Sequence, residues 1–209
     1  GMEYTVGDFI YRVTAIDSIT SGRTKLIGVV AAKKSKLTKV TVPNTANFKG
    51  YGLDVTEVGD NAFKAMKKLK KVTFGANVKV IGKAAFSNCK KLNKINFKNV
   101  TTIGNNAFAG CKALKKLTIG SKVTTIGKNA FKKCTKLKTV VIGKSVKTIK
   151  AKAFTKDNKI KKITFKGKKL KTVKKNALSS KVKKNIKTKK TKLKGNKKAI
   201  KVFKKKLKI

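Results

Sequence analysis

The sequence of 209 residues has no histidine, no tryptophan, a single proline and only seven acidic residues. Without histidine, a serine or cysteine nucleophile lacks the partner that most often activates it. No run of 18 apolar residues occurs, so we expect no membrane-spanning helix. These absences favour a chain that is not an enzyme, with no catalytic residues, no metal site and no cofactor.

Positive charge is abundant and unevenly placed. Residues 1–60 carry eight basic and six acidic residues, whereas residues 61–209 carry 49 lysines and one acid, Asp157. Such a surface concentrates anions. Arginine, which reads phosphates and bases in a bidentate manner, occurs only as Arg12 and Arg23, so diffuse attraction is favoured over shape-specific recognition. A coding bias toward lysine at solvent-facing positions explains the composition equally well.

One line of sequence recurs along the chain. IGKAAFSNCKKLNKINF begins at Ile81, IGNNAFAGCKALKKLTI at Ile103 and IGKNAFKKCTKLKTVVI at Ile126. The first branched position and the central position are held in each cycle by Val58, Ile81, Ile103, Ile126, Ile149 and Val173, and by Phe63, Phe86, Phe108, Phe131, Phe154 and Leu178. A period of 22 to 24 residues with fixed apolar positions is the signature of a solenoid.

Each cycle combines two apolar patterns. L-x-x-V-x-F ends in an alternation, which predicts a short strand with residues such as Val72 and Phe74 pointing inward. G-x-x-A-F-x-x-C has a spacing closer to a helical turn, which predicts a short helix or 3₁₀ segment. One unit cannot enclose its own apolar residues, but stacked units bury them on one another. We therefore predict a single domain over 1–209, a right-handed α/β solenoid with parallel strands and phenylalanine at its centre.

The repeat pattern IG..AF..C..L..I.I resembles the BspA-like bacterial leucine-rich repeats, and Ile81 to Phe97 matches it almost position for position. The resemblance covers Leu37 to Leu178. It implies a leucine-rich repeat superhelix in a secreted or surface-anchored protein, and several such proteins are adhesins toward host matrix proteins. The family often has proline after the strand, and here only VTVP, Val40 to Pro43, keeps it.

The ends of a solenoid need caps, because a bare terminal coil exposes its apolar residues. Residues 1–36, with YTVGDFIYRVTAI and KLIGVVA, predict an N-terminal β-hairpin cap before the repeats at 37–178. Residues 179–209 lose the repeat and contain 15 lysines. In them AIKVF, Ala199 to Phe203, predicts a last strand within a C-terminal cap, and a loosely ordered basic arm is the alternative.

No signal peptide is visible. Gly1 before Met2 has the character of a cloning remnant, so we expect that a native leader has been removed. We expect an extracellular or bacterial cell-surface location and a monomer.

The acidic residues give little evidence of a catalytic or metal site. Asp54, Glu57 and Asp60 form the one acidic cluster, but it has no fourth ligand and no nearby base, so the acids are interpreted as partly offsetting local lysines. Asp157 stands where other cycles place cysteine or methionine, which suggests a turn or capping role.

Three cysteines, Cys89, Cys111 and Cys134, occupy the same place in successive coils. Stacking would put their Cα atoms roughly 5 Å apart, within disulfide range. Because Met66 fills the same slot one coil earlier, we expect small buried side chains and three free thiols.

The outward positions of the predicted strands form the candidate site. They are Lys71, Thr73, Lys94, Asn96, Lys116, Thr118, Thr139, Val141, Lys162 and Thr164. Stacked coils would align them as a lysine column beside a mostly threonine column on the concave face. A merely solvated face is the alternative.

Three functions follow from this surface. The leading hypothesis is a surface or secreted protein that binds a host matrix protein, an acidic glycan or an anionic wall polymer through the lysine and threonine columns. The second is nucleic-acid binding, disfavoured because eight of the eleven phenylalanines are assigned to the core and cannot stack on bases. The third is a structural spacer in a larger surface protein.

Overall fold

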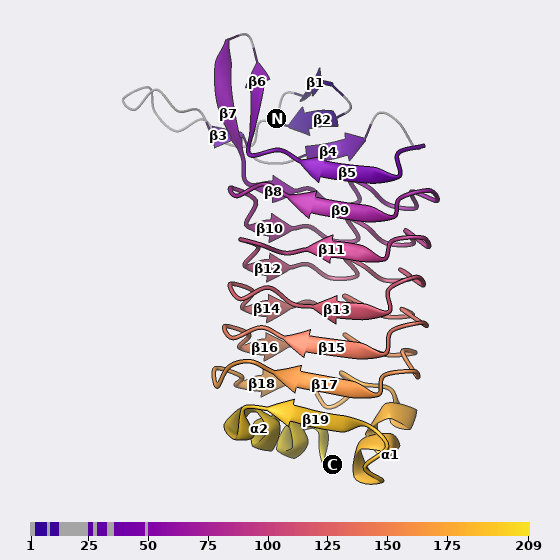
Figure 1. The fold of residues 1–209 in the computed structure, drawn as a ribbon. Coiled ribbons are helices and arrows are strands. Elements are labelled where there is room, and N and C mark those ends of the chain that lie inside the picture. Colours follow the sequence, from indigo (N-terminus) through magenta and orange to yellow (C-terminus); the bar gives the residue numbers. More distant parts are fainter. Residues whose placement is uncertain (1–2, 8, 13–24, 27–28, 33–35, 49) are drawn as a thin grey trace.

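The structure, a computed structural model, describes residues 3–7, 9–12, 25–26, 29–32, 36–48 and 50–209. The chain winds into coils that stack in a column, with the longer strands on the near side of Figure 1 and short strands behind them. The solenoid with parallel strands is confirmed. The column is straight in this view, and both the handedness of the winding and a concave strand face stay predictions.

Each coil contributes one longer strand and one strand of two residues. The longer strands are β5 (Lys39–Val42), β9 (Lys71–Phe74), β11 (Lys94–Asn96), β13 (Lys116–Thr118), β15 (Thr139–Ile142), β17 (Lys162–Phe165) and β19 (Lys192–Gly195). The two-residue strands are β8 (Glu57–Val58), β10 (Val80–Ile81), β12 (Thr102–Ile103), β14 (Thr125–Ile126), β16 (Thr148–Ile149) and β18 (Thr172–Val173). From here on, these two sets are called the long strands and the short strands.

Equivalent residues of successive coils pair with each other. The short strands run through one continuous parallel ladder, for example with Ile81 opposite Ile103. The long strands pair in the same way, with Val140 opposite Ile163, but they form two sheets, β11-β9-β5 and β13-β15-β17-β19. The register therefore carries each short-strand position up the whole stack, and each long-strand position through its own sheet.

Phenylalanine rings occupy the centre of the stack. Phe63, Phe86, Phe108, Phe131 and Phe154 lie one above another, with ring centroids 5.0, 5.2, 5.4 and 5.5 Å apart and planes within 7° of parallel. All five are at most 3% exposed. Burying one such ring contributes about 1.5 to 3 kcal/mol, so the ladder is a main source of the stability of the stack.

The segment G-x-x-A-F-x-x-C is a run of turns, and the predicted helix or 3₁₀ segment is wrong for the described coils. Two residues per coil have a left-handed backbone, which interrupts a helix. They are Asn61 and Ala65, Ala84 and Asn88, Asn106 and Gly110, Asn129 and Lys133, and Lys152 and Lys156. Between them, amides donate to the next coil, as Phe86 N–H does to Ala107 O at 2.8 Å. Stacking overrides the local helical spacing.

The N-terminal end is built from short strands. β1 (Glu3–Val6) and β2 (Phe9–Arg12) form an antiparallel hairpin, and β4 (Val29–Ala32) joins β2 to β8 of the first coil. β3 (Lys25–Leu26) instead pairs with β7 (Tyr51–Val55), which forms a second hairpin with β6 (Thr45–Phe48). That second hairpin projects from the top of the column (Figure 1). The parts of the predicted cap at 1–2, 8, 13–24, 27–28 and 33–35 lie outside the described residues.

The C-terminal segment differs from the prediction. It contains α1 (Ser180–Lys187), then β19 paired with β17, then α2 (Lys197–Leu207). AIKVF lies in α2 and is not a strand, because Ala199, Phe203 and Leu207 recur at intervals of four and form one buried face. Asn196 caps the helix by accepting a hydrogen bond from Ala199 N–H at 3.1 Å. The helices lie against the last coil (Figure 1), and the Phe203 and Phe165 rings are 5.0 Å apart. No helix among the described residues has the length and apolar character needed to cross a bilayer.

Candidate functional site

The register of the long strands aligns the outward residues within each of the two sheets, and equivalent positions of both sheets are grouped here as two columns. The first, here called the lysine column, is Lys39, Lys71, Lys94, Lys116, Thr139, Lys162 and Lys192. The second, here called the threonine column, is Thr41, Thr73, Asn96, Thr118, Val141, Thr164 and Lys194. All the outward residues predicted from the sequence fall in these columns.

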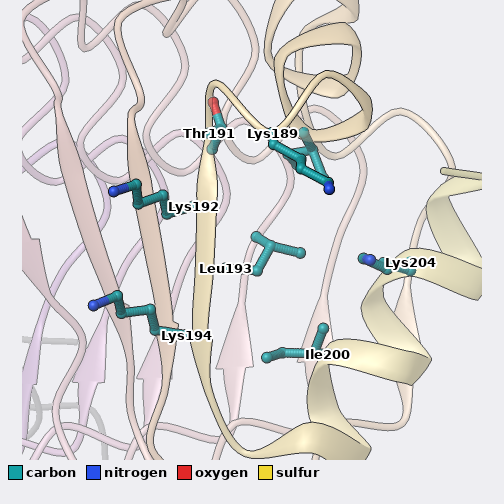
Figure 2. A pocket seen from close by; sticks show the side chains of 8 residues that line it. Lys189, Thr191, Lys192, Leu193, Lys194, Ile200 and Lys204 are labelled. Carbon is teal, nitrogen blue, oxygen red and sulfur yellow. The ribbon is translucent and has the colours of Figure 1, made fainter.

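Sequence reasoning missed both ends of the columns. Lys39 and Thr41 extend them on β5, and Lys192 and Lys194 extend them on β19. The signal that could have found them is the alternation in KVTV and KLKG. It lies outside the regular period, because a hairpin is inserted between β5 and β9 and a helix between β17 and β19. In Figure 2, Lys192 and Lys194 point to the outer side of β19, whereas Leu193 points toward Ile200 on α2. The pocket between β19 and α2 has a volume of about 390 Å³.

The inward residues of the long strands anchor the columns. Val72, Leu117, Val140 and Ile163 are at most 3% exposed, while Lys71, Lys94 and Lys116 are exposed. In the threonine column, the Thr73 hydroxyl donates to the Thr41 hydroxyl at 3.0 Å. The buried side of each strand therefore fixes where its outward side chains begin.

Stacked lysines repel one another, but the stack tolerates this. Strands lie about 4.8 Å apart, and two unit charges at about 5 Å repel by roughly 0.8 kcal/mol in water. Burial of a single phenylalanine outweighs one such contact. An extended anion placed along the column would remove the repulsion, so the arrangement favours binding of negative charge.

The acids near the first coil have structural roles. Asp54 accepts a hydrogen bond from Asn77 Nδ2 at 2.9 Å, and Asp60 accepts one from Lys83 N–H at 2.6 Å, so both acids tie the first coil to the next. Glu57 is half-buried, and burial, with a smaller effect of the Asp60 charge, raises its pKa. Among the described residues, no three potential metal ligands gather in one place.

The cysteines form a buried ladder and are free, as predicted. Cys89, Cys111 and Cys134 each donate from Sγ to a phenylalanine carbonyl of the preceding coil, at 3.0, 3.2 and 3.4 Å. Burial raises the pKa of all three thiols, to about 11 for Cys89. Thiols that stay protonated are poor nucleophiles, so the ladder is structural.

Asp157 occupies the next rung of this ladder. It is completely buried, and neither carboxylate oxygen makes a hydrogen bond to a described residue. Burial raises its pKa to about 8, and the nearby backbone of Cys134 counteracts this only in part. Of the predicted turn or capping role, the turn is present, because Asp157 O accepts a hydrogen bond from Ile160 N–H at 3.3 Å, but the side chain caps no described amide. Asp157 is a buried acid in the position of a thiol.

The comparisons with known proteins agree with this geometry. A family model described as "BspA type Leucine rich repeat region" matches residues 55–192 in six copies. The chain belongs to this BspA-type leucine-rich repeat family. A search of curated proteins finds no match.

Solved structures with a similar fold come from bacteria. A leucine rich cell surface protein from Faecalibacterium prausnitzii has 24% identity and a TM-score of 0.60, over 87% of this chain and 52% of that one. A leucine-rich repeat protein from Bacteroides ovatus has 24% identity and a TM-score of 0.56, over 84% and 55%. The pneumococcal vaccine antigen PcpA has 19% identity and a TM-score of 0.63, over 93% and 48%. The chain thus spans about half the length of these three structures.

Proposed function

We propose that this BspA-type repeat domain is a non-enzymatic binding module of a secreted or cell-surface protein. Its lysine and threonine columns would bind an extended anionic partner: an acidic glycan, an anionic wall polymer or an acidic stretch of a host matrix protein. Membership of a leucine-rich repeat family suggests a protein-binding role, and such proteins are typically not enzymes. The cell-surface description of one structural relative supports the location.

The observation that carries the proposal is the register of the long strands. It aligns Lys39, Lys71 and Lys94 in one sheet, and Lys116, Lys162 and Lys192 in the next sheet of the stack. Residues 61–209 carry a single acid, so few acids offset this charge. Paired neighbours within a sheet lie about 4.8 Å apart, and Thr139 separates Lys116 from Lys162. Lysines spread along the stack in this way suit an extended polymer that carries repeated negative groups. Hydroxyls of the threonine column lie beside it and supply neutral hydrogen bonds.

The test is a matched pair of charge-reversal variants. In the first, Lys71, Lys94, Lys116 and Lys162 are changed to Glu; in the second, Lys79, Lys147, Lys171 and Lys174, exposed beside the short strands, are changed to Glu. Binding to matrix proteins, acidic glycans and teichoic-type polymers is then measured in pull-downs. We expect the first variant to lose binding and the second to keep most of it. Equal losses would show that net charge alone, and not the columns, drives binding.

Nucleic-acid binding is the second candidate, supported by the 49 lysines against one acid in residues 61–209. Salt dependence does not separate the candidates, because every polyanion shows it. Competition does: DNA should displace a bound acidic glycan poorly if the columns suit the glycan. Efficient displacement by DNA would favour the second candidate.

A further inference from the structure

The long-strand face is interrupted between β11 and β13. These strands belong to different sheets, whereas the short strands of the same coils stay paired, with Ile81 opposite Ile103. The coil from Ile81 to Ile103 has a period of 22 residues, one or two shorter than the other cycles. The turn after its long strand is one residue shorter. Val100 N–H donates to Phe97 O at 2.7 Å, whereas in the next coil Val123 N–H donates to Gly120 O, one position later in the repeat. The shortened turn accompanies the loss of pairing on the long-strand side.

The interruption leaves backbone amides without their usual partner. In the coil before it, Asn93 and Lys94 N–H both donate to Lys70 O, at 3.0 and 3.2 Å. In the coil after it, Lys138 and Thr139 N–H both donate to Lys115 O, at 2.8 and 3.3 Å. Among the described residues, no backbone carbonyl accepts from the equivalent amides of Lys115 and Lys116.

A notch opens at the same place. Its volume is about 350 Å³, and it is lined by Asn93, Lys94, Ala113, Lys115, Lys116 and Lys136. Ala113 occupies the position where the other coils place Lys68, Lys91, Lys136 and Lys159. Ala113 presents only a methyl group to the notch, and a lysine or leucine in its place would add heavy atoms to the lining.

We infer that this notch is a site for one phosphate or sulfate group. Consecutive amides bind an anion when they converge on one point, and in the neighbouring coils the two equivalent amides converge on a single carbonyl oxygen. Four lysines around the notch add charge-assisted hydrogen bonds. The group has enough acceptor oxygens to satisfy both amides and several ammonium groups at once. The inference rests on the proposed function, because the notch would anchor one group of the longer anion that follows the lysine column.

The test uses the full chain with inorganic phosphate and inorganic sulfate as probes. Amide chemical shifts of Lys115 and Lys116 are followed by NMR, with the paired amides of Lys138 and Thr139 as internal reference. We expect saturable shifts confined to the first pair. The probe that binds more tightly indicates whether the group comes from a phosphate-bearing wall polymer or from a sulfated glycan.

Three variants separate the effect of the notch from that of added charge. Ala113→Lys adds a positive charge but fills the notch, and Thr135→Lys adds the same charge at an exposed position. Losing one hydrogen bond to a charged group corresponds to about a tenfold loss of affinity, so Ala113→Lys should weaken probe binding about tenfold while Thr135→Lys does not. Ala113→Leu, which fills the notch without charge, should weaken it similarly, and unchanged amide spectra of distant coils serve as the folding control.

Tighter probe binding by Ala113→Lys, or chemical-shift changes of equal size at all four amides, would contradict the inference that the notch binds a phosphate or sulfate group. The proposed function has a separate readout in the column charge reversal. If that variant no longer binds a polyanion while the probes give no saturable shift at Lys115, the notch is not an anion site, and binding by the lysine and threonine columns is still supported.

Discussion

Asp157 shows how one residue can conflict with the repeat that surrounds it. Cys89, Cys111 and Cys134 fill the same position with a neutral donor that reaches a carbonyl. An ionised carboxylate there would be buried without a partner, which costs several kcal/mol. The sequence located Asp157 in the cysteine position, but a single chain does not reveal whether that position is buried enough to keep an acid neutral.

This burial predicts a specific dependence of stability on pH. The pKa of Asp157 rises from an ordinary value near 3.8 to about 8 in the folded state, so the folded chain binds a proton that the unfolded chain releases. The free energy of unfolding should therefore fall as pH rises from about 4 to 8, by at most about 1.4 kcal/mol per pH unit for this group. Asp157→Asn and Asp157→Cys should flatten this slope in urea titrations at several pH values. An unchanged slope in both variants would show that Asp157 is ionised when folded.

Turns set the shape of each element in the stack. The apolar positions of G-x-x-A-F-x-x-C are compatible with a helix, and the sequence alone gave no reason to reject one. The left-handed residues, Asn in several coils but Lys at 133, 152 and 156, become evident only when each amide must reach the neighbouring coil. The same limit applies to α2, where AIKVF was too short to separate a strand from a helix until the spacing of Phe203 and Leu207 was included.

Lys133 offers a direct test of this turn geometry. Its φ is 62°, and the equivalent position in the preceding coil is Gly110, with φ 76°. A left-handed backbone costs a residue with a side chain roughly 1 to 2 kcal/mol, so Lys133→Gly should raise the free energy of unfolding by about 1 kcal/mol in urea titrations. Lys132→Gly, one residue earlier where φ is not positive, should lower it. The opposite order of the two variants would contradict the turn assignment.

At the scale of the whole molecule, the sequence predicted the architecture well and the binding surface in part. The regular spacing of Phe63, Phe86 and Phe108 was sufficient to predict a stacked core, because a repeated apolar position has no other way to be buried. It could not predict the notch at Ala113 or the extension of the columns to Lys192. Both depend on which amides pair between coils, and one shortened coil changes that pairing without altering the apolar pattern.

The lysine column, made by the stacking of equivalent strands, is the centre of the account. Its most direct test is the reactivity of individual lysines toward reductive methylation, read by mass spectrometry with and without a bound acidic glycan or teichoic-type polymer. We expect protection of Lys71, Lys94, Lys116 and Lys162, and unchanged reactivity of Lys79, Lys147 and Lys171 beside the short strands. Equal protection of both groups, or protection of the second group alone, would contradict it.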